Sequence, residues 1–359
     1  MKCMLLNLPS PAGRSVYRSY AGGFGLAGAM PDDETALPIH LLYAASAAKR
    51  LGCVYDVVDG QALRLNASRV ADAVKHSNPD LVISWVSLPS IHEDLALLSE
   101  IRRTTPGAVV IALGALCNAM PQEVLLKGEV DLAICGWYPH YALVSNAIQV
   151  LSSSPRSQDA FDKIGGARYV REGAVVESPV APCDEDLDNL SLDVYHQLPV
   201  RKYLGKVPDI RGSTIDCLSV ITGAGCPYAC MYCPYPVGYG RKVIHKSIPL
   251  IINELEFLKT DFGVTGFLFE DELFTHDVNR VEELCDEITS RDLNVKWYAQ
   301  ARVDEVSDGL LAKMKRAGCF RIHYGVETGS PEMLRKTGKP GLDTDRVKKV
   351  FEMTRRLGL

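Results

Sequence analysis

The sequence lacks the features that mark a membrane-bound, secreted or nucleic-acid-binding protein. No segment reaches the roughly 18 consecutive apolar residues that a transmembrane helix needs. The N-terminus, "MKCMLLNLPS", has neither the long apolar region nor the small-residue cleavage site of a signal peptide. A formal net charge of −5 gives no excess of basic residues for binding nucleic acid or anionic lipid. We therefore expect neither a membrane nor a nucleic acid as a partner.

Internal repeats, low-complexity segments and histidine metal motifs are absent as well. The 359 residues are 47% hydrophobic and 23% charged, which is ordinary for a globular protein and enough for about two domains of 100–200 residues. Cysteine departs from this average composition, since 11 cysteines are an odd and fairly high count. Without a secretory signal, they indicate a reducing, cytoplasmic location and metal or redox chemistry rather than a framework of disulfide bonds.

Residues 1–154 alternate short apolar runs with helical patterns. Strands are predicted at 2–8, 53–60, 80–87, 108–114 and 130–136, and helices at 38–51, 67–76, 91–103 and 140–151. Apolar strands separated by helices are typical of a parallel sheet that is covered on both faces, so we expect a doubly wound, Rossmann-like α/β domain. Such sheets bind ligands outside the carboxyl ends of their strands, which here lead into the loops 8–13, 85–90, 114–118 and 136–139.

A literal G-x-G-x-x-G sequence, "GFGLAG" at 23–28, lies in this domain but does not favour a dinucleotide site. The dinucleotide fingerprint follows a strand directly and opens a helix, whereas this segment begins about fifteen residues after the first predicted strand. It then runs into "AMPDDETALP". We interpret it as a mobile or ligand-covering loop.

Residues 155–211 break the alternation and are predicted to form a connector. A small hairpin fits 167–179 with Gly173 in its turn, and an acidic run follows at 183–193. From residue 212 the alternation resumes, with strands at 216–222, 265–270, 296–302 and 321–326 and helices at 249–261, 278–291, 308–317 and 344–357. These four βα units predict a partial (β/α) barrel over 212–359, with its chemistry at the carboxyl ends of the strands. Four parallel strands leave an open edge, so we expect that the chain is truncated or that another element covers this edge.

Three cysteines lie close together after the first strand of the predicted barrel, in the segment "GAGCPYACMYCPYP" at 223–236. Structural zinc usually takes two separated cysteine pairs, and no second pair lies nearby. A disulfide bond would use only two of the three thiols and needs an oxidising compartment. An iron–sulfur cluster is held by cysteine thiolates, and one loop can supply three of them. Buried structural cysteines are the remaining alternative, but Cys226, Cys230 and Cys233 follow a strand end in a loop rich in Gly, Pro and Tyr.

The Cys-x3-Cys-x2-Cys spacing, with Tyr232 just before the third cysteine, resembles the cluster motif of the radical S-adenosylmethionine (SAM) enzymes. "FLFEDELFTHD" at 267–277, "QARVDEV" at 300–306 and "HYGVETGS" at 323–330 extend this resemblance. The resemblance implies that Cys226, Cys230 and Cys233 ligate a four-iron (4Fe–4S) cluster whose fourth iron binds SAM.

The same resemblance implies four side chains at the SAM site. Tyr232 is expected against the adenine, and Glu327 at the ribose hydroxyls. Arg302 is expected to pair with a substrate carboxylate through a charge-assisted fork. Glu270, Asp271 and Glu272 cannot all face inward on an extended segment, and Asp271 is our choice for the site.

A parallel-sheet domain ahead of a radical SAM barrel resembles the cobalamin-binding subgroup of this superfamily. This resemblance implies cobalamin contacts from the loops at the carboxyl edge of the first sheet, namely from Ser10, Trp85, Ser87, Gly114, Ala115 and Gly136. The chain departs from the pattern in two places. The Asp-x-His-x-x-Gly sequence, whose histidine is a lower cobalt ligand in many cobalamin proteins, is missing after the first strand, which reads "NLPSPAG". "GWYP" at 136–139 replaces an acidic Gly-Glu-Gly-Glu pattern. A degenerate domain that has lost cobalamin is therefore an alternative.

These resemblances imply a cobalamin-dependent radical SAM enzyme, most simply a methyltransferase that acts on an unactivated carbon of a small molecule. A reductase or an electron donor of the flavodoxin or ferredoxin type is the expected protein partner. One alternative is a radical SAM enzyme without cobalamin, of the methylthiotransferase, cyclase or rearrangement type. Another is a non-catalytic, truncated iron–sulfur module.

Overall fold

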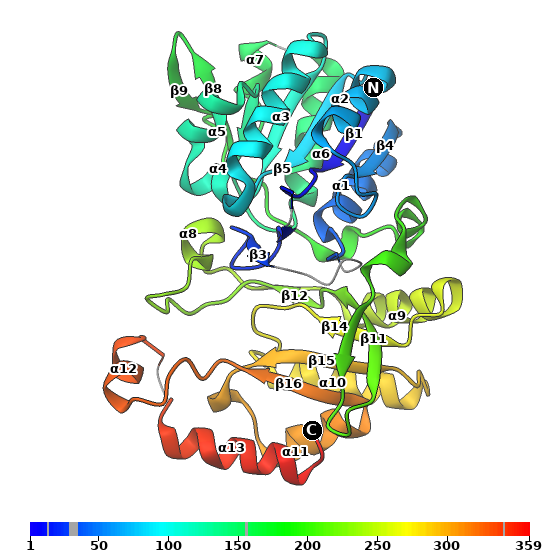
Figure 1. The fold of residues 1–359 in the computed structure, drawn as a ribbon, viewed down its shortest axis with the longest axis vertical. Coiled ribbons are helices and arrows are strands. Elements are labelled where there is room, and N and C mark those ends of the chain that lie inside the picture. Colours follow the sequence, from blue (N-terminus) through cyan, green and yellow to red (C-terminus); the bar gives the residue numbers. More distant parts are fainter. Residues whose placement is uncertain (13, 29–34, 155–156, 340–341) are drawn as a thin grey trace. The chain divides into compact units, whose positions relative to one another are not determined.

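The computed structural model describes residues 1–12, 14–28, 35–154, 157–339 and 342–359. The chain divides into two compact units, each built around its own sheet (Figure 1). Unit 1 comprises Met1–Lys202 and Pro234–Gly240, and unit 2 comprises Tyr203–Cys233 and Arg241–Leu359. Both sheets are largely parallel with helices between their strands, so the predicted α/β fold class is confirmed.

The sheet of unit 1 has the strand order β4-β1-β5-β6-β7-β8-β9. Its parallel strands are β1 (Lys2–Asn7), β4 (Val54–Asp59), β5 (Leu81–Trp85), β6 (Val109–Leu113) and β7 (Leu132–Ile134). β4 and β5 lie on opposite sides of β1, so the strand order reverses there. Ligands of doubly wound sheets bind at the carboxyl ends of the strands at such a reversal. The loops that follow β1 and β5 therefore flank the expected binding position.

Helices cover both faces of this sheet (Figure 1). α1 and α6 pack against each other, whereas α3 contacts both α2 and α5. The helices of unit 1 are α1 (Ile39–Arg50), α2 (Ala67–Ser77), α3 (Ile91–Thr104), α4 (Ala115–Ala119), α5 (Pro121–Gly128), α6 (Tyr141–Ser153), α7 (Gln158–Phe161) and α8 (Tyr235–Tyr239). β5 and β6 are buried along their whole length, as expected for strands with helices on both sides. The four long helices match the predicted ones to within two residues, whereas the loop predicted at 114–118 is largely helix α4.

The predicted hairpin at 167–179 consists of β8 (Ala167–Arg171) and β9 (Ala174–Glu177), with Gly173 in its turn. The sequence did not indicate its partner. β8 pairs antiparallel with β7 and so continues the sheet of unit 1. This pairing covers the edge that β7 would otherwise present to solvent. Three short 3-10 helices follow, η2 (Leu187–Asn189), η3 (Leu192–Gln197) and η4 (Val200–Tyr203).

A second small hairpin, β2 (Ser15–Tyr17) and β3 (Leu26–Gly28), follows β1 and was not predicted. Residues 26–28 of the "GFGLAG" segment form β3, so this segment does not open a helix as a dinucleotide fingerprint does. Residues 29–34 of the "AMPDDETALP" stretch lie outside the described residues.

The main sheet of unit 2 has the order β10-β11-β14-β15-β16. β11 (Thr214–Val220), β14 (Gly266–Phe269), β15 (Lys296–Ala301) and β16 (Cys319–Tyr324) are parallel and form the half barrel that the βα pattern predicts. The antiparallel β10 (Gly205–Pro208) covers the β11 edge of this sheet, whereas β16, after which a fifth barrel strand was expected, is the outer strand at the other edge. The helices are α9 (Ile248–Phe262), α10 (Val278–Ser290), α11 (Asp308–Arg316), α12 (Pro331–Lys336) and α13 (Thr344–Arg356), and β12 (Gly223–Ala224) pairs with β13 (Ile244–His245).

Serine residues occupy the N-cap positions of two helices of unit 2. Ser307 caps α11, and its hydroxyl oxygen accepts a 3.2 Å hydrogen bond from the Leu310 backbone N–H. Ser247 occupies the N-cap position of α9. No helix among the described residues combines the length and apolar character that crossing a membrane requires.

Candidate functional site

The three clustered cysteines of unit 2 lie in one loop directly beyond β11 and β12. Gly225 begins this loop with φ +109°, and a Cβ there would lie 1.9 Å from the carbonyl oxygen of Lys242, so only glycine fits. Cys226, Cys230 and Cys233 are all half-buried, and the Cys233 N–H donates a 3.0 Å hydrogen bond to the Cys230 carbonyl. We call residues 225–233 the cluster loop. It presents three thiols at the carboxyl end of the half barrel.

The number and placement of these thiols suit a metal cluster. Burial raises the pKa of Cys226, the Tyr228 backbone N–H lowers it, and the neighbouring thiols of Cys233 and Cys230 raise it further. In the part of the chain that the structure describes, no three His, Cys, Asp or Glu side chains converge on one point as ligands of a single ion would. The thiols that hold a four-iron cluster need not converge on one point, because each cysteine binds a different iron. The donor set therefore fits a cluster better than a single metal ion.

Glu272 anchors the start of the cluster loop and was not singled out from the sequence. Its Oε2 accepts a 2.9 Å hydrogen bond from the Gly225 backbone N–H, next to Cys226. Burial raises the pKa of Glu272 to about 7. The only signal in the sequence was its place in the acidic run "EDE" after β14, from which we chose Asp271 instead.

Asp271 is buried and holds the carboxyl ends of two strands together. Its carboxylate accepts hydrogen bonds from the Thr222 backbone N–H (2.7 Å) and hydroxyl (2.6 Å), just beyond β11. Burial raises the pKa of Asp271, although the Thr222 hydrogen bonds act in the opposite direction. The Arg280 guanidinium donates to the carbonyls of Thr222 and Lys246, at 2.7 and 2.8 Å. Asp271 thus fixes the strand ends that lead into the cluster loop.

Tyr228, in the first cysteine spacing, connects the cluster loop to the end of β15. Its phenol donates a 3.0 Å hydrogen bond to Glu305 Oε1, in the 3-10 helix η5 (Val303–Glu305). The Arg302 guanidinium lies 3.9 Å from the centre of the Tyr228 ring, a cation–π contact. Arg302 also donates two hydrogen bonds to Asp304, at 2.9 and 2.7 Å. The fork predicted to bind a carboxylate therefore already binds one, from within the chain.

Tyr232 and Glu327 come together at the far end of the cluster loop. A hydrogen bond joins the Tyr232 side chain to the Glu327 carboxylate, and burial together with this bond raises the pKa of Tyr232. Lys339 pairs with Glu327 and donates a 2.9 Å hydrogen bond to the Gly325 carbonyl. Burial acts to raise the pKa of Glu327, but the hydrogen bonds from Lys339 and Tyr232 outweigh it and lower the pKa. Lys339 was not predicted from the sequence.

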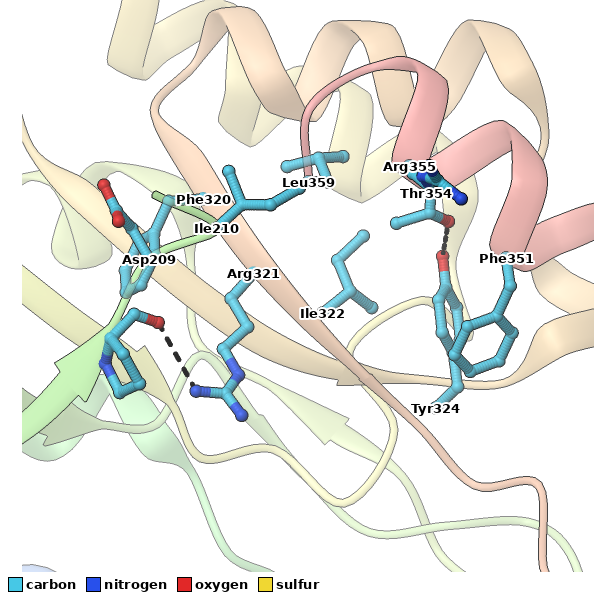
Figure 2. A pocket seen from close by; sticks show the side chains of 11 residues that line it. Asp209, Ile210, Phe320, Arg321, Ile322, Tyr324, Phe351, Thr354, Arg355 and Leu359 are labelled. Atoms are coloured by element: carbon cyan, nitrogen blue, oxygen red, sulfur yellow. Dashed lines mark hydrogen bonds between the residues drawn. The ribbon is translucent and has the colours of Figure 1, made fainter. Parts of the chain in front are cut away.

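A separate pocket of about 360 Å³ opens beside the last strand of unit 2 (Figure 2). Arg321 donates to the Pro208 carbonyl (3.4 Å) on one side, and Tyr324 shares a 2.9 Å hydrogen bond with Thr354 on the other. None of the cysteines or predicted SAM-site residues lines this pocket. It is therefore distinct from the cluster loop.

In unit 1 an aromatic group of buried side chains lies at the carboxyl edge of the sheet. The rings of His40 and His140 each lie 4.4 Å from that of Trp85, which ends β5. Both nitrogens of His40 and the indole N–H of Trp85 are buried without a hydrogen-bond partner among the described residues. Burial lowers the pKa of His40, and it lowers that of His140 to about 3, so both imidazoles are neutral. Buried polar atoms without partners are rare in folded proteins, and these fit a site whose polar contacts a bound ligand completes.

The other residues predicted to contact cobalamin follow the carboxyl ends of β1, β5, β6 and β7. Gly114 has φ +116°, and a Cβ there would lie 2.7 Å from the Trp85 indole nitrogen. Ala115 begins α4. Gly136 exchanges two hydrogen bonds with the Asn118 side chain, at 3.0 and 3.1 Å. Ser10 lies after β1, where its hydroxyl accepts from the Val16 N–H at 3.1 Å.

Ser87 belongs to a buried network that the sequence did not reveal. Arg18 donates to both oxygens of Asp94, at 2.5 and 2.9 Å, and to the Ser87 hydroxyl at 2.8 Å. The side chains of Arg18 and Asp94 are 2% and 1% exposed, so the pair is fully desolvated. A buried pair of this kind persists only with excellent geometry, and here it fixes the loops after β1 and β5.

Known proteins resemble both units. Residues 220–359 match the radical SAM superfamily. An uncharacterized methyltransferase of Pyrococcus horikoshii is 24% identical over 326 residues, which are 88% of this chain and 66% of that protein. An anaerobic magnesium-protoporphyrin IX monomethyl ester cyclase of Cereibacter sphaeroides is 23% identical over 87% of this chain and 49% of the cyclase. The chain thus spans about half to two thirds of the length of these relatives.

One solved structure shares the fold across both units. The radical SAM methyltransferase TsrM from Kitasatospora setae, with cobalamin and a 4Fe–4S cluster bound, has a TM-score of 0.75 at 16% identity. The alignment covers 100% of this chain and 65% of TsrM. At this identity the likeness establishes the fold alone, a doubly wound sheet followed by a half barrel.

Proposed function

We propose that the chain is a cobalamin-dependent radical SAM enzyme that methylates an unactivated carbon of a small molecule, because residues 220–359 match the radical SAM superfamily. A 4Fe–4S cluster, SAM and cobalamin are its proposed cofactors. When bound, these groups supply the reductive cleavage of SAM and a transferable methyl group, for which no amino-acid side chain is equipped. The chain's own residues hold and orient these groups and exclude water from them.

The cluster loop is the observation that carries this proposal. The loop that carries its three half-buried thiols is held from outside by hydrogen bonds from the Gly225 N–H to Glu272, from the Tyr228 phenol to Glu305 and from the Met231 N–H to the Thr337 carbonyl. These partners follow three different strands of the half barrel. A loop anchored in this way keeps Cys226, Cys230 and Cys233 near one another without metal. Less conformational entropy is therefore lost when a cluster binds.

We propose Tyr232, Glu327, Arg302 and Asp271 as the residues of the SAM site. The Tyr232–Glu327 hydrogen bond supports a joint role at the adenine and ribose, because it places an aromatic face beside a carboxylate acceptor. To pair with a substrate carboxylate, the Arg302 guanidinium would share its N–H donors between that carboxylate and Asp304, or release Asp304. Asp271, whose oxygens accept from Thr222, supports the site by holding the strand ends in place.

For cobalamin we propose the carboxyl edge of the unit 1 sheet, with Ser10, Trp85, Ser87, Gly114, Ala115 and Gly136 as contacts. The support is the reversal of strand order beside β1 and the buried nitrogens of His40 and Trp85 that have no partner among the described residues. Neutral imidazoles and an indole N–H suit the amide groups of a large, mostly apolar macrocycle, because they hydrogen-bond without carrying charge.

We also propose a cytoplasmic location and an electron donor of the flavodoxin or ferredoxin type. A reducing compartment is supported by the 11 cysteines, none of which forms a disulfide bond in the part of the chain that the structure describes. Reductive cleavage of SAM consumes an electron, which the chain has to receive from a partner.

Ring closure is a second candidate reaction, because a cyclase is among the relatives that match 87% of this chain. The residues at the cluster loop do not distinguish methylation from cyclisation, since both begin with the same cleavage of SAM. The two differ in the mass of the product, which rises by one methyl group only on methylation.

Anaerobic reconstitution with iron and sulfide tests the proposed cluster chemistry. We expect about four irons per chain and the release of 5′-deoxyadenosine when a reductant and SAM are added. Cys230→Ala should abolish both. Cys183→Ala is the matched control, because Cys183 is a half-buried thiol outside the cluster loop. Equal loss of iron in both variants, or 5′-deoxyadenosine from Cys230→Ala, would refute the proposal.

A further inference from the structure

Glu305 lies where three loops of unit 2 meet. Its Oε1 accepts the 3.0 Å hydrogen bond from the Tyr228 phenol of the cluster loop. Its Oε2 accepts a second 3.0 Å hydrogen bond from the Thr275 hydroxyl, in the loop after β14. Glu305 itself follows β15, as does Arg302, whose Nε lies 3.7 Å from Oε1. One carboxylate therefore joins the loops after β11, β14 and β15.

The Tyr228 ring is held on its face as well as at its hydroxyl. The Arg302 guanidinium lies over the ring at 3.9 Å, and Asp304 orients that guanidinium through two hydrogen bonds. A guanidinium that is fixed in this way loses little further freedom when it stacks on an aromatic face. Tyr228 is thus constrained both along its O–H bond and perpendicular to its ring.

Burial distinguishes this group from an ordinary surface ion pair. The side chains of Arg302, Glu305 and Asp304 are 6%, 13% and 19% exposed, and Thr275 is fully buried. Water screens such contacts much less than exposed ones.

The position of Tyr228 in the chain makes this contact relevant to the thiols. It lies between Cys226 and Cys230, and its backbone N–H hydrogen-bonds the Cys226 thiol. The segment 226–233 has no helix or strand of its own to fix it. A displacement of Tyr228 therefore moves the backbone from which the first two thiols project.

We infer that Tyr228 and Glu305 are positioning residues that set the geometry of Cys226 and Cys230 and couple the cluster loop to the Arg302–Asp304 pair. This inference rests on the proposed function, since it assigns the thiols to a 4Fe–4S cluster. Neither residue contacts the reacting atoms in this assignment. Their effect is on how tightly, and in what electronic environment, the chain holds the cluster.

The test compares Tyr228→Phe and Glu305→Gln with Tyr324→Phe in the anaerobically reconstituted full chain. Tyr324 is a matched control, because its phenol shares a hydrogen bond of similar length (2.9 Å) with Thr354 in the same unit, outside the cluster loop. The measurements are the rate of iron release to a ferrous chelator and the electron paramagnetic resonance (EPR) spectrum of the reduced cluster.

We expect Tyr228→Phe to release iron about tenfold faster than wild type, the effect of losing one hydrogen bond to a charged group. Its EPR spectrum should be shifted, whereas Tyr324→Phe should match wild type in both measurements. Glu305→Gln keeps an acceptor oxygen for the phenol, so its rate of iron release should lie between the rates of wild type and of Glu305→Ala. A purely structural role would alter the thermal midpoint of the metal-free chain but not the spectrum.

Identical release rates and spectra for Tyr228→Phe and Tyr324→Phe, with an intact wild-type cluster, would overturn this inference alone. A wild-type chain that binds no iron would contradict the proposed function and this inference together. If Tyr228→Phe does not fold, Glu305→Gln decides through the same comparison with Tyr324→Phe.

Discussion

His40 and Trp85 bury polar nitrogens at the edge of the unit 1 sheet with no hydrogen-bond partner in the described part of the chain. Such atoms destabilise a fold, because the hydrogen bonds that they make to water in the unfolded chain are not replaced. We therefore expect that these two side chains bind a ligand. His40 and Trp85 should thus lower the stability of the cofactor-free chain and favour ligand binding, and both effects can be measured.

His40→Phe should stabilise the cofactor-free chain by about 1–2 kcal/mol, because it removes two buried nitrogens and keeps an aromatic ring in place. The same change should weaken hydroxocobalamin binding at least about fivefold, the loss of roughly one hydrogen bond. Urea unfolding and equilibrium dialysis measure the two effects. His92→Phe, at an exposed position of α3, is the control and should change neither. A variant that is more stable yet binds normally would remove His40 from the site.

Glu185 gives a residue-scale prediction about pH. Its carboxylate accepts from the Ala142 N–H at the start of α6, at 3.1 and 3.2 Å. Burial raises its pKa from 4.5 to about 8, so the folded chain holds this proton more tightly than the unfolded chain. The stability that Glu185 contributes is therefore complete below about pH 4.5 and is lost as the pH rises to 8.

Hydrogen exchange at the first amides of α6 measures this loss. Between pH 5 and pH 8 the free energy of opening should fall by about 2–4 kcal/mol in wild type and by less than about 0.5 kcal/mol in Glu185→Gln. Glu93→Gln, at an exposed position of α3, should keep the wild-type slope. Equal slopes in wild type and Glu185→Gln would show that Glu185 does not titrate in this range.

At the scale of elements, substitutions at two helical glycines distinguish the effect of close packing on stability from the effect of helix propensity. A Cβ at Gly238 in α8 would lie 2.7 Å from the Ala115 Cβ of α4, whereas a Cβ at Gly309 in α11 meets nothing within 4 Å. Gly238→Ala should therefore destabilise the chain by about 1–3 kcal/mol through overpacking. Gly309→Ala should stabilise it by about 0.5–1 kcal/mol through helix propensity.

Thermal unfolding of the two alanine variants measures these opposite signs. A stabilising Gly238→Ala would mean that α8 does not pack on α4 as described. That result would also weaken the place of Ala115 at the proposed cobalamin site, because α4 would then be free to move.

The helices and strands that could be predicted from the sequence are those whose residue pattern lies within the element itself. The helices 91–103 and 308–317 were located to within one residue, because their apolar periodicity and caps lie within the helices themselves. The pairing of β8 with β7 and of β10 with β11 was not predicted, since a strand's partner is not encoded in its own residues. The same limit applies to the site. The cysteine spacing was visible, whereas Glu272 and Glu305 reach the cluster loop from other loops, and Lys339 reaches Glu327 from another loop.

At the scale of the whole molecule, the chain crosses between its units beside the thiols. It leaves unit 2 after Cys233, contributes Pro234–Gly240 to unit 1 and returns to unit 2 at Arg241. Asn118 ties this inserted segment to unit 1 through its contact with the Gly238 carbonyl. The third cysteine is thus covalently adjacent to a segment that packs in the proposed cobalamin unit. We therefore expect one chain to hold both cofactors.

The most direct test of that claim is to count iron and cobalamin on the same full chain. The chain is reconstituted anaerobically with iron, sulfide and hydroxocobalamin, desalted, and assayed for iron and, from its ultraviolet–visible spectrum, for cobalamin. We predict about four irons and close to one cobalamin per chain. Four irons without cobalamin would contradict the account and leave a radical SAM enzyme that works without cobalamin.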